Sequence, residues 1–256
     1  MSGNLQSIWR YPIKGFTPEP LEGVTLAAGE HVPFDRLFAV ENGPSGFDPA
    51  TPRHISKQKF TVLARFPAVA RIRTAFDDAT GFLQAEAPGA PPFEGDLNQP
   101  DAAAAFAGWL AVVLGEDARG PLRVLHAPRA HRFMDDEEGF VSIINLASVR
   151  ALEAAVGRPV DPLRLRANLY VDGWPAWAED ATPGGSIQVG TVRMKIAKTI
   201  TRCVATHVDP ATGERDMELV RNLFESFGHT HCGIYASVTE GGRLSCGDVA
   251  RLDAPA

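Results

Sequence analysis

The residues of this chain that are best suited to chemistry include a free cysteine beside an arginine. Cys203 follows Arg202 in a segment whose sequence is TRCVATHVDP. A cationic neighbour favours the thiolate, which is the form of cysteine that attacks electrophiles or ligates a soft metal. We expect residues 203–208 to form a strand, and a strand would turn Arg202 away from Cys203. Cys203 is therefore a candidate nucleophile or metal ligand, with a small buried thiol as the alternative.

A second group of candidate ligands lies at residues 229–232, where the sequence is HTHC. On a strand, His229 and His231 would share one face while Cys232 pointed to the other, which is a poor start for one tetrahedral site. We therefore expect polar residues entering a strand here rather than a zinc site. The acidic run Asp135–Glu138 is expected to form a solvated loop.

Composition and motif searches exclude several classes of protein. The formal net charge of −6 over 256 residues does not indicate binding to nucleic acid or to an anionic membrane. Three cysteines without a CxxC pair argue against a disulfide framework, an iron–sulfur cluster and a zinc ribbon. The GxGxxG, GxxxxGK[ST], GxSxG and HExxH patterns are absent. With no secretory signal and no membrane-length apolar stretch, a cytoplasmic protein is expected.

The elements that must position these residues are mainly strands. The first hundred residues contain short hydrophobic runs separated by Gly, Pro, Asn and Asp, a pattern typical of a barrel or sandwich. Helices are predicted over 102–114, 146–156 and 214–227, with Asp101 and Asn145 as N-caps of the first two. We therefore predict a mainly β (α+β) fold with a few helices.

Several motifs together resemble the MOSC domain, the molybdenum-cofactor sulfurase C-terminal domain. TRCVATHVDPATG is similar to the MOSC signature, and Tyr11–Lys14 resembles the Y-P-[VI]-K opening of the β-barrel domain that precedes MOSC in many members. Further matches follow in family order at Asp35–Phe38, Arg166–Gly173, Ala178–Asp180, Gly233–Val238 and Gly247–Val249. The resemblance implies a smaller β-rich N-terminal barrel domain over 1–118 and a MOSC β-barrel-like domain over 119–256.

The motifs are most similar to those of the group containing the mitochondrial amidoxime-reducing component and its bacterial relatives. This resemblance implies a molybdenum cofactor whose metal is ligated by Cys203. Cationic side chains suit the phosphate of the pterin, a role that falls to Lys14, Arg36 and Arg166. The remaining implied contacts are a hydrogen bond to the pterin from Asn168, cofactor contacts from Thr201 and Arg202, and a water or proton positioned near the metal by Asp180.

The sequence departs from the family pattern near the implied cofactor. Gly15 stands where the family often has Ser or Thr after the lysine. Lys57 stands where relatives often carry an arginine. Ala181–Gly184 follows the A-E-D motif where the family usually continues towards a tryptophan, in a loop expected to border the metal.

The resemblance implies that the chain is a molybdenum-dependent oxidoreductase. It would reduce N-hydroxylated compounds, or N- or S-oxides, by oxygen-atom transfer. No iron–sulfur cluster and no pyridoxal phosphate are expected on this chain. The electrons for a small-molecule substrate should therefore come from a separate donor protein of flavin, haem or ferredoxin type. The alternative is a sulfur-carrier or cofactor-handling MOSC protein that uses a persulfide on Cys203.

Overall fold

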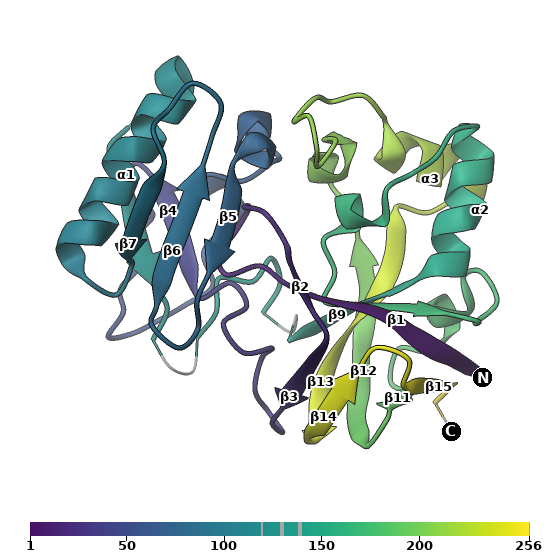
Figure 1. The fold of residues 1–256 in the computed structure, drawn as a ribbon. Helices are drawn as coiled ribbons and strands as arrows, with labels where there is room; N and C mark the ends of the chain where they lie inside the picture. Colours follow the sequence, from purple (N-terminus) through teal and green to yellow (C-terminus); the bar gives the residue numbers. More distant parts are fainter. Residues whose placement is uncertain (119, 129–130, 138–139, 256) are drawn as a thin grey trace.

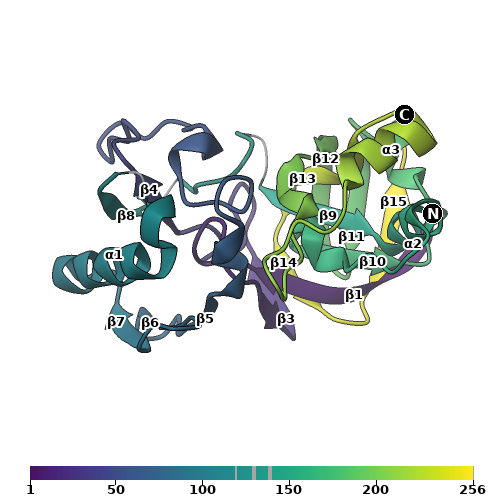
Figure 2. The same cartoon turned by 90° about the horizontal axis from the view of Figure 1, so that it is seen from above.

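The computed structural model describes residues 1–118, 120–128, 131–137 and 140–255. Two lobes stand side by side, and the chain passes from one into the other after its first strand (Figure 1). The same division is visible from above (Figure 2). Within the described residues, no helix has the length and apolar character needed to cross a membrane.

Seven strands of the C-terminal lobe close into a barrel. Their order is β10-β9-β13-β12-β11-β15-β1, and β1 pairs back with β10 to complete the ring. All neighbours are antiparallel except β9 and β10. In barrel order, the strand bounds are Leu169–Asp172, Val141–Asn145, His231–Glu240, Val192–Thr201, Ser186–Val189, Val249–Asp253 and Ser2–Arg10.

The core of the barrel follows from alternation along its strands. In β12, Val192, Met194 and Ile196 are buried, while Arg193 and Lys195 between them are exposed. Because successive side chains on a strand point to opposite faces, this spacing turns one apolar face inward. Two short strands, β3 (Gly23–Leu26) and β14 (Gly242–Ser245), pair beside the barrel, and β2 (Glu19–Leu21) pairs with β1.

The N-terminal lobe consists of two small sheets and one helix. A pair of strands and a set of three strands form the sheets: β4 (Phe38–Asn42) with β8 (Leu122–His126), and β5 (Arg73–Phe76), β6 (Phe82–Glu86) and β7 (Phe93–Asp96). Helix α1 (Pro100–Leu114) buries Phe106 and Leu110 against them. The predicted mainly β fold with a few helices is confirmed.

Two helices lie side by side against the barrel (Figures 1 and 2). As predicted, α2 (Leu146–Val156) is capped by Asn145, whose side chain accepts a hydrogen bond from the Ala147 N–H at 3.0 Å. Helix α3 covers only Leu219–Phe227. It starts later than predicted because residues 214–216 pair back onto residues 207–209: the Asp209 N–H donates to the Glu214 carbonyl, and Val208 forms a β-bridge with Arg215.

The predicted strand over 203–208 is wrong. Strand β12 ends at Thr201, and a 3-10 helix occupies Val204–His207. The amide and the hydroxyl of Thr206 both donate to the Cys203 carbonyl, at 3.0 and 2.9 Å, which closes the backbone into a turn. Cys203 therefore lies where the barrel strand stops, not within a sheet.

The barrel takes its first strand from the opposite end of the chain. The Met1 amino group donates to the Leu252 carbonyl at 2.7 Å, and β1 lies between β15 and β10. Residues 1–118 therefore contain a strand of the C-terminal barrel. The boundary between residues 118 and 119 stays a prediction, and residue 119 lies outside the described residues.

This topology predicts that residues 120–256 do not fold alone. Without β1, strands β10 and β15 are left with unpaired edges, and such edges favour aggregation. Circular dichroism and urea unfolding of the fragment should show no cooperative transition. Appending residues 1–32 after residue 255 through a short linker should restore one, because Met1 and Leu252 are neighbours. A cooperative transition in the bare fragment would contradict the prediction.

Candidate functional site

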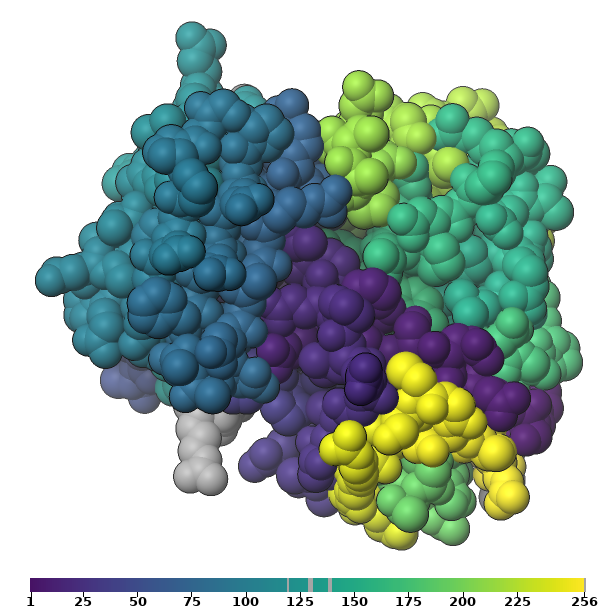
Figure 3. Space-filling model, viewed as in Figure 1, coloured from purple at the N-terminus to yellow at the C-terminus, as the bar shows by residue number. Residues whose placement is uncertain are grey.

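A pocket of about 340 Å³ lies between the two lobes. In the space-filling view the lobes meet on either side of the first segment of the chain (Figure 3). That segment contributes Lys14 and Gly15 to the pocket wall, while the barrel contributes the end of β12 and Cys203. The volume falls within the range of small-molecule sites, about 300–1,000 Å³.

The pocket is strongly cationic, although the chain as a whole is acidic. Its described lining includes two carboxylates, Asp135 and Asp136, and seven cationic side chains, a surplus of five positive charges. The cations are Lys14, Arg36, Lys57, Arg164, Arg166, Lys198 and Arg202. Such a concentration of one sign in a cleft favours an anionic ligand.

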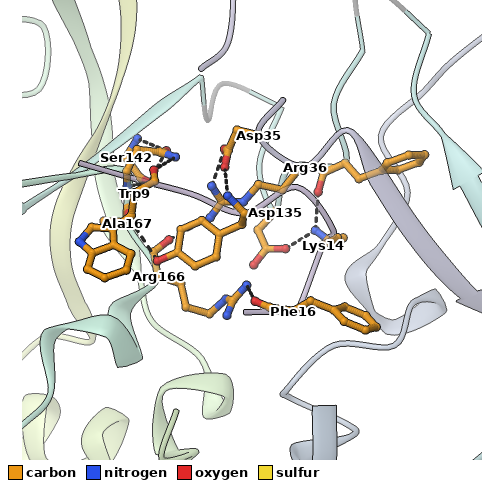
Figure 4. Close-up of polar contacts among 12 residues, drawn as sticks. Trp9, Lys14, Phe16, Asp35, Arg36, Asp135, Ser142, Arg166 and Ala167 are labelled. Carbon is orange, nitrogen blue, oxygen red and sulfur yellow. Dashed lines mark hydrogen bonds and ion pairs between the residues drawn. The ribbon is translucent and has the colours of Figure 1, made fainter. Parts of the chain in front are cut away.

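Lys14 is buried at the base of this charge cluster. Its ammonium donates to the Phe133 carbonyl at 2.8 Å and pairs with Asp135 (Figure 4). Burial lowers the pKa of Lys14, and Asp135 opposes that shift. Although burial alone would raise the pKa of Asp135, the ammonium groups of Lys14 and Lys57 hold it well below its ordinary value.

Two of the predicted arginines share one aromatic support. The guanidinium carbons of Arg36 and Arg166 lie 4.2 and 4.4 Å from the centre of the Tyr11 ring. Arg36 also donates to the Arg166 carbonyl at 2.9 Å and pairs with Asp35, while Arg166 donates to the Phe16 carbonyl at 2.9 Å (Figure 4). The ring and the carbonyls fix both cations beside the pocket.

The backbone is strained where these arginines lie. Four described residues other than glycine have positive φ, and they include Arg36 (47°) and Arg166 (52°). Each such residue costs about 1–3 kcal/mol and persists only where the surrounding contacts impose it. The contacts to Tyr11 and to carbonyl oxygens supply that support. Two of the four strained residues therefore carry cations of the pocket wall.

Cys203 meets a lysine that was not among the predicted site residues. The Lys57 ammonium lies 3.2 Å from the Cys203 sulfur and 3.8 Å from a carboxylate oxygen of Asp135. Burial alone would lower the pKa of Lys57, but Asp135 and the cysteine raise it. A lysine ammonium beside a sulfur stabilises negative charge on it. Sequence comparison had marked Lys57 only as a departure from the family pattern, because only the fold brings it to Cys203.

The neighbours of Cys203 have different surroundings. Thr201 lies on the pocket wall at the end of β12. Arg202 also lines the pocket, but its guanidinium donates to two backbone carbonyls, those of Leu165 at 2.8 Å and Cys232. Arg202 therefore ties the segment next to Cys203 to the start of β13 and to the 3-10 helix Pro162–Leu165.

The structure does not bring Asn168 or Asp180 to the described lining of the pocket. Asn168 is buried, and its amide joins three strands by donating to the Trp9 carbonyl at 3.1 Å and accepting from Ser142. Ser142 itself lines the pocket, so Asn168 positions part of the wall. Asp180 faces His229 and His231 instead.

Residues 135–137 of the acidic run form an irregular, largely exposed loop, as expected, but its first two residues also have a role at the pocket. Asp135 and Asp136 are pocket residues, and their partners are lysines of the wall: Lys14 and Lys57 for Asp135, and Lys198, at 2.9 Å, for Asp136. Glu138 lies outside the described residues. An acidic run carries no sequence signal that it lines a pocket, because the lysines that pair with it lie far away in the sequence.

Gly15 has a structural reason to be glycine. Its φ is +89°, and a Cβ at this position would lie 2.7 Å from the Thr61 carbonyl oxygen and 2.9 Å from the Val62 Cα. Both the conformation and the space exclude a side chain. The loop after Lys14 is therefore packed against backbone where the family often has a hydroxyl.

Comparisons with known proteins match two successive parts of the chain to two family models. The family model for the MOSC N-terminal beta barrel domain matches residues 2–117, and that for the MOSC domain matches residues 129–251. The chain is 32% identical over 85 residues to mitochondrial amidoxime-reducing component 1 from Mus musculus, and 33% identical over 96 residues to molybdenum cofactor sulfurase from Caenorhabditis elegans. These matches span 33% and 35% of this chain, but only 24% and 13% of the relatives.

One solved structure is similar over nearly the whole chain. The YUAD protein from Bacillus subtilis aligns with 98% of this chain and 94% of its own, at 13% identity and a TM-score of 0.47.

Lys57→Gln should slow alkylation of Cys203 at neutral pH. Removing the ammonium takes away the cation that contacts the sulfur at 3.2 Å, so the rate with iodoacetamide should fall about threefold or more. The measurement uses a Cys246→Ser background, since Cys246 is the exposed thiol and Cys232 is buried. Lys59→Gln, in the same 3-10 helix, is the control and should leave the rate unchanged. Equal rates in both variants would refute the contact.

Gly15→Ser should destabilise the protein by about 1–3 kcal/mol, measured by urea unfolding, because the serine would adopt positive φ and clash with backbone. Gly29→Ser separates the two causes. Gly29 also has positive φ (+73°) but open space around it, so its variant should lose less. Equal free energies of unfolding in the two variants would contradict the contribution of the backbone clash at Gly15.

Proposed function

Because the chain is a MOSC protein with both its N-terminal barrel domain and its MOSC domain, we propose that it binds a molybdenum cofactor in the cationic pocket. We propose further that it reduces N-hydroxylated compounds, or N- or S-oxides, by oxygen-atom transfer. The observation that carries the proposal is the convergence of Cys203 with a surplus of five positive charges in one pocket.

The chemistry of the pocket fits such a cofactor. A thiolate is a soft donor suited to molybdenum, and Cys203 is partly exposed at the pocket wall. Lys14, Arg36 and Arg166 would hold the anionic end of the pterin, and the family resemblance gives them the same role. Arginine binds phosphate through two parallel N–H groups, while lysine acts as a point charge.

The residues around the sulfur would tune its donor strength. When bound, the molybdenum centre supplies the two-electron chemistry that removes oxygen from the substrate. Lys57 donates to the Cys203 sulfur at 3.2 Å, and such a hydrogen bond withdraws electron density from a ligand. Its ammonium also carries a proton at the pocket wall. Thr201 and Arg202 also line the pocket beside Cys203, and Arg202 is fixed by its hydrogen bonds to the Cys232 and Leu165 carbonyls.

The proposal includes a separate electron donor of flavin, haem or ferredoxin type and a cytoplasmic location. The name of the mouse relative links this family to amidoxime reduction, which supports a small-molecule substrate. Asp180, predicted to act near the metal, faces two histidines instead. We therefore base the proposed chemistry on Cys203 and Lys57.

The test is metal and pterin analysis of protein made in a host that synthesises the cofactor. Wild type should contain stoichiometric molybdenum and reduce benzamidoxime with a chemical electron donor. Cys203→Ser should contain only background molybdenum and lose turnover, because the soft ligand is gone. Cys246→Ser, at an exposed thiol outside the described pocket lining, should match wild type.

Two outcomes would overturn the proposal. Wild type without molybdenum would remove the cofactor, and full reductase activity in Cys203→Ser would remove its proposed ligand. A persulfide mass shift on Cys203 without amidoxime turnover would instead support the sulfur-carrier alternative, which the name of the C. elegans relative also suggests.

A further inference from the structure

Three potential metal ligands converge beside the barrel, outside the described lining of the cationic pocket. Asp180 lies in the 3-10 helix Ala178–Ala181, His229 follows α3, and His231 begins β13. One ligand atom from each lies within 4.8 Å of the others. The Asp180 carboxylate is 3.2 Å from His231 Nδ1 and 3.7 Å from His229 Nε2.

We propose that Asp180, His229 and His231 bind a divalent transition metal ion of the zinc class. Ligands about 2.0–2.1 Å from a tetrahedral ion lie roughly 3.3 Å from one another. The 3.2 and 3.7 Å separations are close to that value. Two imidazole nitrogens and one carboxylate oxygen form a donor set that zinc and its neighbours accept, with the fourth position filled by solvent.

The cluster contains polar atoms that lack partners. Asp180 Oδ1, His229 Nδ1 and His231 Nδ1 are all buried, and none makes a hydrogen bond to the described residues. Although Asp180 Oδ1 and His231 Nδ1 are close, their geometry is not that of a hydrogen bond. Buried polar atoms are nearly always satisfied, and Asp180 Oδ1 and His231 Nδ1, which lie 3.2 Å apart, are two that a bound ion would satisfy.

The surroundings allow an ion to enter and restrict how it binds. The three side chains are 21–26% exposed, so solvent reaches them. The two imidazole rings are stacked at 3.9 Å and 6°, and Trp177 packs edge-on against His229 at 5.1 Å. Lone pairs of parallel rings do not meet, so binding requires one imidazole to rotate about its side-chain bonds.

An ion at this place would tie the loop 178–181 to β13. His231 pairs with Thr201 in the barrel register, and Thr201 lines the cationic pocket. The ion would thus fix a loop next to the pocket without belonging to it. Cys232, the residue after His231, is fully buried in the hydrophobic cluster that includes residues of α2 and α3, and it is not one of the three converging ligands.

Calorimetric zinc titration of chelator-treated Cys203→Ser protein tests the site. The serine removes the pocket thiol, so the result does not depend on the proposed cofactor or on activity. Saturable binding of one ion per chain is expected. Asp180→Asn and His229→Gln should each weaken zinc binding and so raise the dissociation constant at least about tenfold. His126→Gln, at an exposed histidine of β8, should leave it unchanged.

The absence of saturable binding to the Cys203→Ser protein would overturn the proposal, whatever the variants do. Binding that Asp180→Asn and His229→Gln both leave intact would overturn it as well, by placing the ion elsewhere. A rise in melting temperature with zinc, lost in these two variants but kept in His126→Gln, would support the site independently. Circular dichroism without zinc establishes that the variants are folded.

Discussion

Closure of the barrel by β1 is the constraint on which the rest of the structure depends. The strand pairs with β15 on one side and β10 on the other, so a segment from the start of the chain completes a sheet built from its end. The next residues, Tyr11–Lys14, then leave the barrel at the junction of the lobes. The same pairing that seals the barrel therefore delivers an aromatic support and a lysine to the pocket.

That placement lets the protein concentrate positive charge. Like charges in one cleft repel, and burial lowers the pKa of Lys14 and Arg166. The Tyr11 ring, Asp135 and a set of backbone carbonyls offset this repulsion. Because these partners are arranged before any ligand arrives, the pocket offers fixed charges to an anion rather than flexible side chains.

The candidate site and the proposed ion site both lie at the ends of barrel strands. Strand β12 stops at Thr201, and the turn that follows presents Cys203 to the pocket. Strand β13 begins at His231, directly opposite Thr201 in the register. The cysteine and the histidine–carboxylate cluster are thus neighbours across one strand pair, and both depend on the place where the sheet ends.

The sequence by itself predicted the mainly β fold and the N-cap at Asn145, because alternation and capping are properties of neighbouring residues. The grouping of Lys14, Arg36, Arg166 and Cys203 in one site was implied by the resemblance of ordered motifs to a known family.

Only the tertiary structure decided which distant side chains meet. It brought Lys57 to Cys203, made the acidic run part of the pocket wall and paired Asp180 with two histidines. These contacts join residues about 50 to 150 positions apart. Such separations are set by how the lobes pack and how the barrel closes, and no local spacing encodes them.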